Sequence, residues 1–339
     1  MKKFFGIALL ASLLFSCSSH DDNSNTTDLN SNYHEGIFLT NEGNFGKANA
    51  SISWIDKSLT SIKNNIFDQE NGSNLGDVAQ SMTFNDDLAY LVVNASNVVE
   101  VVHKNTFKKI ATITQNIVEP RYAVVENDLL YVTNSNQTVT VYNATNFQYI
   151  QSIALDFNPE HIVESNNKLY VVSNSWTVPA TVAVINLPTY QVEKTINFPS
   201  AINGLTEEDG NVYVLTTSAR NSTIETLSGT AHLTTSTLPQ TDARYLSEDQ
   251  GNLYFTSNLG IYAVAIAQLV PNANAVELFK VSDNSWSSLY GFNVFDGKFF
   301  TADAKGFTEA SEITIYTVNG TILTTFKGGI GTNGFYQED

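Results

Sequence analysis

The sequence contains only three arginines, Arg121, Arg220 and Arg244, in a chain with a formal net charge of −17. A guanidinium group presents a planar fork of hydrogen-bond donors and stacks on flat π-systems. The strand pattern described below places all three arginines on one face of the fold, where they would form a local positive patch for a ligand. Two alternatives stay open: the arginines cluster by accident, or nearby acidic side chains neutralise them.

Aromatic side chains and one histidine fall on the same predicted face. Aromatic rings with a few polar groups suit a large, flat, amphipathic ligand, although each ring taken alone is more often a packing residue. His161 could serve as an axial ligand to a metal that a bound molecule carries. The aromatic candidates for ligand contact are Phe45, Tyr122, Trp176, Tyr245, Trp286 and Phe335.

Motifs for catalysis or for a resident metal are missing from the sequence. The five histidines are scattered, without HExxH spacing or a cysteine cluster, so we predict no metal site and no cofactor. Residues 329–334 match GxGxxG, but no βαβ unit surrounds them, and we interpret them as a loop. Because no nucleophile elbow or serine–histidine pairing is apparent, we expect no catalytic residues and no enzyme.

Cys17, the only cysteine, predicts a lipid anchor. Lys2 and Lys3 precede an apolar stretch over residues 4–15, which is too short to span a bilayer and has the length of a signal-peptide core. The sequence before Cys17 resembles a bacterial lipobox; an ordinary signal peptide with a chance cysteine is the alternative. We predict a signal peptide over residues 1–16, then lipidated Cys17 and a flexible acidic tether to residue 34.

The acidic run after Cys17 resembles the surface-export signal of Bacteroidetes lipoproteins. It implies a lipoprotein of the outer membrane that is exposed at the cell surface and touches the membrane through its lipid alone. The acidic charge would repel phosphate backbones, so nucleic acid is not an expected partner.

An internal repeat predicts the elements that position these residues. Strand-like segments with a central aromatic recur 39 to 52 residues apart, and asparagine or aspartate turns separate them. The pattern is typical of an all-β, seven-bladed β-propeller of four-stranded antiparallel blades over residues 35–339, with six or eight blades still open. The recurring aromatics are Phe38, Tyr90, Tyr131, Tyr170, Tyr213, Tyr254 and Phe299.

The first repeat predicts how the ring closes. Residues 36–39, 51–55 and 61–67 supply three strands, and the C-terminal segment 334–337 can supply the missing innermost one. Joining the chain ends in one blade would remove exposed sheet edges. Residues 119–153 show a complete unit, with strands expected over 121–125, 129–133, 138–142 and 149–153.

The connections predict two unlike faces. Short turns at 85–87, 126–128, 166–168, 208–210 and 296–297 predict a flat face that is low in chemistry. Longer loops at 41–50, 68–80, 174–180, 217–223 and 303–311 gather on the opposite face. Binding function commonly resides on such loops, so we call this the long-loop face and place the candidate site there.

The opening and closing segments resemble a known family. Residues 39–56, with Asn-Glu-Gly-Asn-Phe-Gly at 41–46, and the closing residues 331–336 are similar to the YncE-like propeller lipoproteins of Bacteroidetes. That family includes surface lipoproteins that capture cobamides and cap a TonB-dependent vitamin B12 transporter. Its members often carry a proline in the closing loop, which this chain lacks.

The resemblance implies a function to weigh against two others. It implies a lipoprotein that binds a small-molecule nutrient, a corrinoid, and hands it to a TonB-dependent outer-membrane transporter. A protein- or glycan-binding surface scaffold is the first alternative. A propeller enzyme, either a lyase or quinoprotein-like, is the second; three tryptophans and no repeated docking motif argue against the quinoprotein version.

Overall fold

The computed structural model describes residues 32–282 and 285–338, and Asn32–Asp339 forms one compact unit. The predicted signal peptide, Cys17 and most of the predicted tether lie outside the described residues. Within the described part of the chain, no helix is long and apolar enough to cross a membrane.

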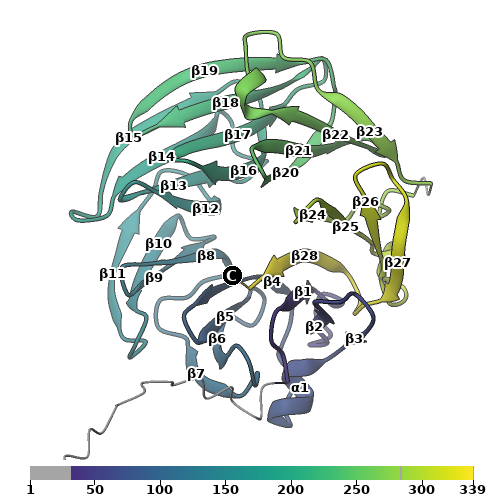
Figure 1. The fold of residues 1–339 in the computed structure, drawn as a ribbon. Helices are drawn as coiled ribbons and strands as arrows, with labels where there is room; N and C mark the ends of the chain where they lie inside the picture. Colours follow the sequence, from purple (N-terminus) through teal and green to yellow (C-terminus); the bar gives the residue numbers. More distant parts are fainter. Residues whose placement is uncertain (1–31, 283–284, 339) are drawn as a thin grey trace, which may run out of the picture. The chain divides into compact units, whose positions relative to one another are not determined.

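Residues 32–338 form a seven-bladed β-propeller, as the repeat predicted (Figure 1). Each blade is a four-stranded antiparallel sheet, and the blades follow one another around the ring in chain order. From the innermost strand outward, blade 1 contains β28 (Thr332–Gln337), β1 (Gly36–Asn41), β2 (Ser51–Asp56) and β3 (Ile62–Lys63). Blade 2 contains β4 (Ala79–Asn85), β5 (Leu88–Val93), β6 (Val98–His103) and β7 (Lys109–Ile113). Blade 3 contains β8 (Pro120–Glu126), β9 (Leu129–Asn134), β10 (Thr138–Asn143) and β11 (Tyr149–Ala154).

The remaining blades repeat this order. Blade 4 contains β12 (Pro159–Ser165), β13 (Lys168–Ser173), β14 (Ala180–Asn186) and β15 (Gln191–Phe198). Blade 5 contains β16 (Ala201–Glu208), β17 (Asn211–Thr217), β18 (Ser222–Ser228) and β19 (Ala231–Leu238). Blade 6 contains β20 (Ala243–Asp249), β21 (Asn252–Ser257), β22 (Gly260–Ala265) and β23 (Val276–Lys280). Blade 7 contains β24 (Gly291–Phe295), β25 (Lys298–Asp303), β26 (Glu312–Thr317) and β27 (Ile322–Lys327).

The recurring aromatics are the packing centres of this ring. All seven are buried, and each lies on the second strand of its blade. Two of them also donate hydrogen bonds to the next blade, from the Tyr90 hydroxyl to the Ala144 carbonyl and from the Tyr170 hydroxyl to the Gly229 carbonyl, both at 2.9 Å. A buried tyrosine therefore supplies a large apolar area and a specific link between neighbouring blades.

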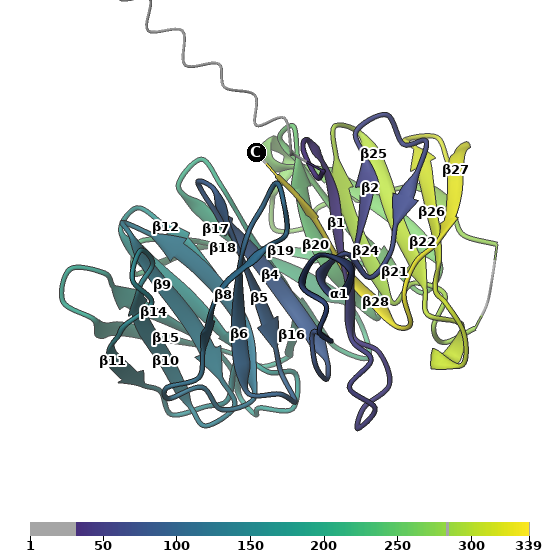
Figure 2. The ribbon, with the colours of Figure 1, turned by 90° about the horizontal axis from the view of Figure 1, so that it is seen from below.

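The short turns follow from residues that tolerate a left-handed backbone. Asn127 and Asp128 join β8 to β9 with φ values of 51° and 59°, and Asn166 and Asn167 join β12 to β13 with 53° and 60°. Two-residue hairpins of this kind match the twist of antiparallel strands. The long β1–β2 loop projects from the end of the ring opposite to the C-terminus (Figure 2).

The C-terminal strand closes the ring, as predicted. β28 pairs antiparallel with β1, and Phe38 lies opposite Tyr336. The predicted strand over residues 61–67 is wrong in its second half, because β3 ends at Lys63 and helix α1 (Ile66–Asn71) follows. α1 buries Ile66 and Phe67 against the core. Two short 3-10 helices, η1 (Ile266–Gln268) and η2 (Lys305–Phe307), complete the helical elements of the described residues.

Candidate functional site

A β-bulge interrupts six of the seven innermost strands near the long-loop face. At each bulge the pairing register with the neighbouring strand shifts and leaves one or two residues unpaired. Bulges re-aim side chains and occur frequently beside functional sites. The residues freed from the ladder are Gln80, Arg121–Tyr122, Glu160–His161, Asn203, Tyr245–Leu246 and Asn333.

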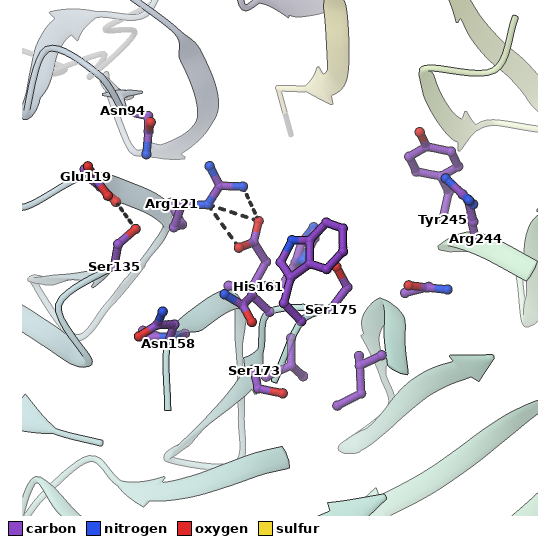
Figure 3. A pocket seen from close by; sticks show the side chains of 17 residues that line it. Asn94, Glu119, Arg121, Ser135, Asn158, His161, Ser173, Ser175, Arg244 and Tyr245 are labelled. Atoms are coloured by element: carbon purple, nitrogen blue, oxygen red, sulfur yellow. Dashed lines mark hydrogen bonds and ion pairs between the residues drawn. The ribbon is translucent and has the colours of Figure 1, made fainter. Parts of the chain in front are cut away.

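Several of these residues line a cavity of about 470 Å³ on the long-loop face, which we call the first cavity. Five of the predicted site residues line it, with Arg121 on one side and Arg244 and Tyr245 on the opposite side (Figure 3). Its full lining comprises Asn94, Glu119, Arg121, Ser135, Asn158, Pro159, Glu160, His161, Val172, Ser173, Asn174, Ser175, Trp176, Ile202, Asn203, Arg244 and Tyr245.

Arg121 is tied to two neighbouring blades. Its Nε donates to both carboxylate oxygens of Glu160 at 3.1 and 3.0 Å, and its Nη2 donates to Glu160 Oε1. Its Nη1 donates to Gln80 Oε1 at 2.6 Å. The side chains of Arg121 and Glu160 are 27% and 18% exposed, so this forked ion pair is mostly shielded from water.

The predicted positive patch is wrong for two of its three members. Glu160 neutralises Arg121, and Asp242 pairs with Arg244 through hydrogen bonds of 3.2 and 3.0 Å. Arg220 is exposed in the β17–β18 loop and does not line the first cavity. For Arg121 and Arg244, the alternative in which acidic neighbours offset the charge is therefore the one observed.

His161 lies in the wall of the first cavity and stacks on Tyr122. The two rings are 3.8 Å apart with an interplanar angle of 28°. Burial lowers the pKa of His161 to about 4, since Arg121 adds to the effect and Glu160 opposes it only in part. The imidazole is neutral at pH 7. Tyr122 itself supports His161 and does not line the first cavity.

A second cavity, of about 510 Å³, adjoins the first and shares Asn94 and Arg121 with it. Its carboxylate is Glu42, which accepts hydrogen bonds from the Tyr290 hydroxyl at 2.9 Å and from Asn333 Nδ2 at 3.1 Å. Burial raises the pKa of Glu42. The lining comprises Glu42, Gly43, Asn44, Phe45, Val78, Gln80, Asn94, Arg121, Tyr290 and Phe307.

One hydrogen-bonded chain links the inner ends of six blades around the two cavities. Asn333 Nδ2 donates to the Gln80 carbonyl at 2.9 Å, and the Tyr245 hydroxyl donates to the Tyr290 carbonyl at 2.8 Å. Sequence reasoning missed Gln80, Glu160 and Asn333, because no local signal marks a bulge, and it also missed Glu42 and Tyr290, which lie in loops. In order around the ring, the chain runs through Glu160, Arg121, Gln80, Asn333, Glu42, Tyr290 and Tyr245.

Some of the predicted aromatic residues are exposed beside the cavities, and others are buried. Phe45, Trp176 and Trp286 are 82%, 88% and 76% exposed, which is unusual for such large rings. Phe45 lines the second cavity and Trp176 the first. The prediction for Phe335 is wrong: it pairs opposite Leu39, is only 2% exposed and packs in the core at 5.8 Å from Phe300.

Trp286 sits one layer behind the second cavity. Its ring lies nearly parallel to that of Phe307, at 6.1 Å and 15°, and Phe307 lines the cavity. Four residues that line the cavities, Val78, Glu119, Tyr245 and Phe307, adopt left-handed backbone conformations, with φ values from 42° to 63°. The same conformation occurs at residues outside both linings, such as Phe107 and Phe147, so it does not by itself mark the site.

The face with the short turns carries several glutamates, whereas the sequence predicted few functional side chains there. Glu126, Glu164, Glu207 and Glu248 lie at or next to the last residue of β8, β12, β16 and β20. Burial, followed by the charges of Glu126 and Glu207, raises the pKa of Glu164. Across residues 32–282 and 285–338, no group of three or more histidine, cysteine or acidic side chains is arranged to hold a metal ion.

Comparisons with known proteins identify the fold and a sequence family. The profile of a domain of unknown function, DUF5074, matches residues 35–291. No curated protein matches the sequence. A quinoprotein alcohol dehydrogenase-like protein from Bacteroides thetaiotaomicron is similar in structure, with a TM-score of 0.70 and 12% identity over 90% of this chain and 78% of the other.

Two further structures resemble the chain less closely. BamB from Moraxella catarrhalis has a TM-score of 0.55 and 14% identity, covering 87% of this chain and 83% of its own. Apo AztD from Citrobacter koseri has a TM-score of 0.58 and 9% identity, covering 88% and 96%. At these identities the likeness shows the propeller fold alone.

Proposed function

The chain belongs to the DUF5074 family, and we propose that it is a surface-exposed lipoprotein that binds a nutrient on its long-loop face. The single observation that carries the proposal is the pair of adjoining cavities at the mouth of the ring, which share Asn94 and Arg121. Their volumes fall within the range of small-molecule sites. The role proposed is capture without catalysis.

A corrinoid of the vitamin B12 type is the ligand that the resemblance to cobamide-capture lipoproteins favours. A corrin is broad and flat, with apolar faces and a rim of amides. The first cavity offers the amides of four asparagines and the rings of Trp176 and Tyr245, which match these two features. His161 is neutral at pH 7, the state that an axial nitrogen ligand to the corrinoid metal requires.

Titration with cobalamin tests this proposal directly. We expect binding in the micromolar range or tighter by calorimetry, and Trp176→Ala should weaken it because the indole lines the first cavity. Leu233→Ala is the matched control, since Leu233 is an exposed apolar residue on the outermost strand β19. A visible absorption shift that His161→Ala removes would support axial ligation. Absence of cobalamin binding to the folded protein would remove the corrinoid.

Handover to a TonB-dependent outer-membrane transporter, with anchoring through lipidated Cys17, completes the proposal. The lipobox-like sequence supports the anchor. Cys17→Ser should abolish incorporation of radiolabelled palmitate and release the protein from the membrane fraction. Co-purification of a transporter with the lipidated protein, and loss of surface protease accessibility in a Cys17→Ser strain, are the expected outcomes; an unchanged distribution argues against the anchor.

A glycan-binding scaffold is the second candidate, and the two exposed tryptophans favour it. Indole faces stack on sugar rings, and Trp176 and Trp286 are two strongly exposed indoles at the long-loop face. A glycan array read with the wild type and with Trp176→Ala and Trp286→Ala would decide. Glycan binding that both variants lose, together with no cobalamin binding, would favour this function.

A further inference from the structure

One wall of the second cavity is built from aromatic side chains that hold one another in place. Tyr290 meets Phe307 edge to face, with centroids 4.9 Å apart at 83°, and Trp286 extends the wall behind Phe307. Asn44 Nδ2 donates to the Phe307 carbonyl at 2.8 Å, and Gly331 packs so closely that a Cβ there would lie 2.5 Å from the Phe307 ring. The wall is therefore held in place before any ligand arrives.

The carboxylate of Glu42 contributes a negative charge to the same cavity. The Tyr290 hydroxyl and Asn333 Nδ2 fix its two oxygens, one each. Among the described residues no lysine or arginine forms an ion pair with Glu42. Arg121, the one cationic residue in the lining, is already committed to Glu160. The cavity thus presents a fixed carboxylate whose charge no side chain offsets by direct contact.

We propose that the second cavity is a subsite for an organic cation, an alkylammonium group that rests against the rings of Phe45, Tyr290 and Phe307 and faces Glu42. Aromatic rings carry negative charge on their faces and attract desolvated ammonium groups, most strongly where water is excluded. The subsite does not depend on corrinoid binding, because it uses residues of the second cavity only.

The charges favour a cation over an anion or a neutral group. Around the two cavities Glu42, Glu119 and Glu160 face Arg121 and Arg244, and Asp242 offsets Arg244. An anion would meet this excess of carboxylates, whereas a neutral ligand would gain nothing from the charge of Glu42. Only a cation uses both the rings and the carboxylate.

Choline and its neutral carbon isostere, 3,3-dimethyl-1-butanol, form the test. The two have nearly the same shape, so calorimetry at pH 8 isolates the contribution of the charge. We expect the wild type to bind choline about tenfold or more tightly than the isostere, because cation–π contacts and a facing carboxylate together contribute that much. Quenching of Trp286 fluorescence on choline addition provides a second readout.

Substitutions in the second cavity test whether choline binds there. Glu42→Gln should weaken choline about tenfold, and Phe307→Leu should weaken it as well. Glu309→Gln is the matched control, because it removes the same charge from an exposed position in the neighbouring loop and should leave choline binding unchanged. Circular dichroism verifies that each variant is folded.

Equal affinities for choline and its isostere would overturn the inference, as would an equal effect of Glu42→Gln and Glu309→Gln. No choline binding by the wild type overturns it too. The comparison of the two ligands uses only the wild type, so it tests the inference even if a variant misfolds. Cobalamin binding that persists without choline binding would refute the cation subsite and leave the proposed function intact.

Discussion

Arg121→Ala and Arg244→Ala are predicted to differ strongly in stability, although both arginines line the first cavity. Arg121 makes four hydrogen bonds, three to Glu160 and one to Gln80, in a pair that is mostly shielded. Removing one partner of a fully buried pair costs ~3–5 kcal/mol. Because about a quarter of the Arg121 side chain is exposed, we expect a loss of about 2–3 kcal/mol in the free energy of unfolding.

Arg244 should matter little to stability. Its side chain and that of Asp242 are both more than half exposed, and exposed pairs contribute ~0–1 kcal/mol. Urea unfolding followed by tryptophan fluorescence compares the two variants. The double variant Arg121→Ala/Glu160→Ala should recover about 1 kcal/mol relative to Arg121→Ala, because it removes the orphaned carboxylate. Equal midpoints for Arg121→Ala and Arg244→Ala would refute this account of the charges.

Three further predictions follow from burial and closure. Burial lowers the pKa of His161 to about 4, so between pH 6.5 and 4 the unfolded chain binds a proton at this residue and the folded protein does not. The free energy of unfolding therefore falls as pH drops through this range. His161→Phe should lose less stability than the wild type between pH 7 and pH 5 in urea titrations. Burial raises the pKa of Glu164, so the folded protein loses stability as pH rises from the ordinary glutamate pKa through the raised one, and Glu164→Gln should be more stable than the wild type at pH 8 but not at pH 4. Deleting residues 332–339 removes β28 and exposes the edge of β1, which should give aggregates in size-exclusion chromatography; a folded monomer would contradict closure by this strand.

The repeat made the fold predictable because the same pattern of strands and turns recurs in each blade. One buried aromatic per second strand and one asparagine- or aspartate-rich turn per hairpin recur in a way that a single domain core does not. The sequence failed at Ile66 and Phe67, where a short apolar run reads equally well as strand or helix. Asn65 adopts a left-handed conformation there and begins α1, which buries the same two side chains.

The site was predictable only in outline. The strand pattern predicted a shared face for Arg121, His161, Trp176, Arg244 and Tyr245, and these five residues line one cavity. It could not identify the partners of these residues, because the ion pair of Arg121 joins positions 39 residues apart in the chain. Alternation along a strand also fails where a bulge inserts a residue.

Phe335 shows the effect of such a bulge on a single residue. Asn333 is the extra residue in β28, and the two residues that follow it pair opposite Thr40 and Leu39. Phe335 therefore points to the core, while Asn333 donates to Glu42, which lines the second cavity. The polar neighbour, and not the aromatic ring, is the residue of this strand that serves the site.

Pairing changes what the arginines offer to a ligand. Arg121 uses three of its N–H groups on Glu160 and Gln80, which leaves two without an acceptor among the described residues. A guanidinium fixed in this way is an oriented donor with little net charge around it, so it favours a carbonyl or hydroxyl oxygen at close range over long-range attraction of an anion. At the first cavity, contact and shape therefore contribute more to affinity than net charge, and the amide carbonyls at the rim of the proposed corrinoid would accept hydrogen bonds from these two N–H groups.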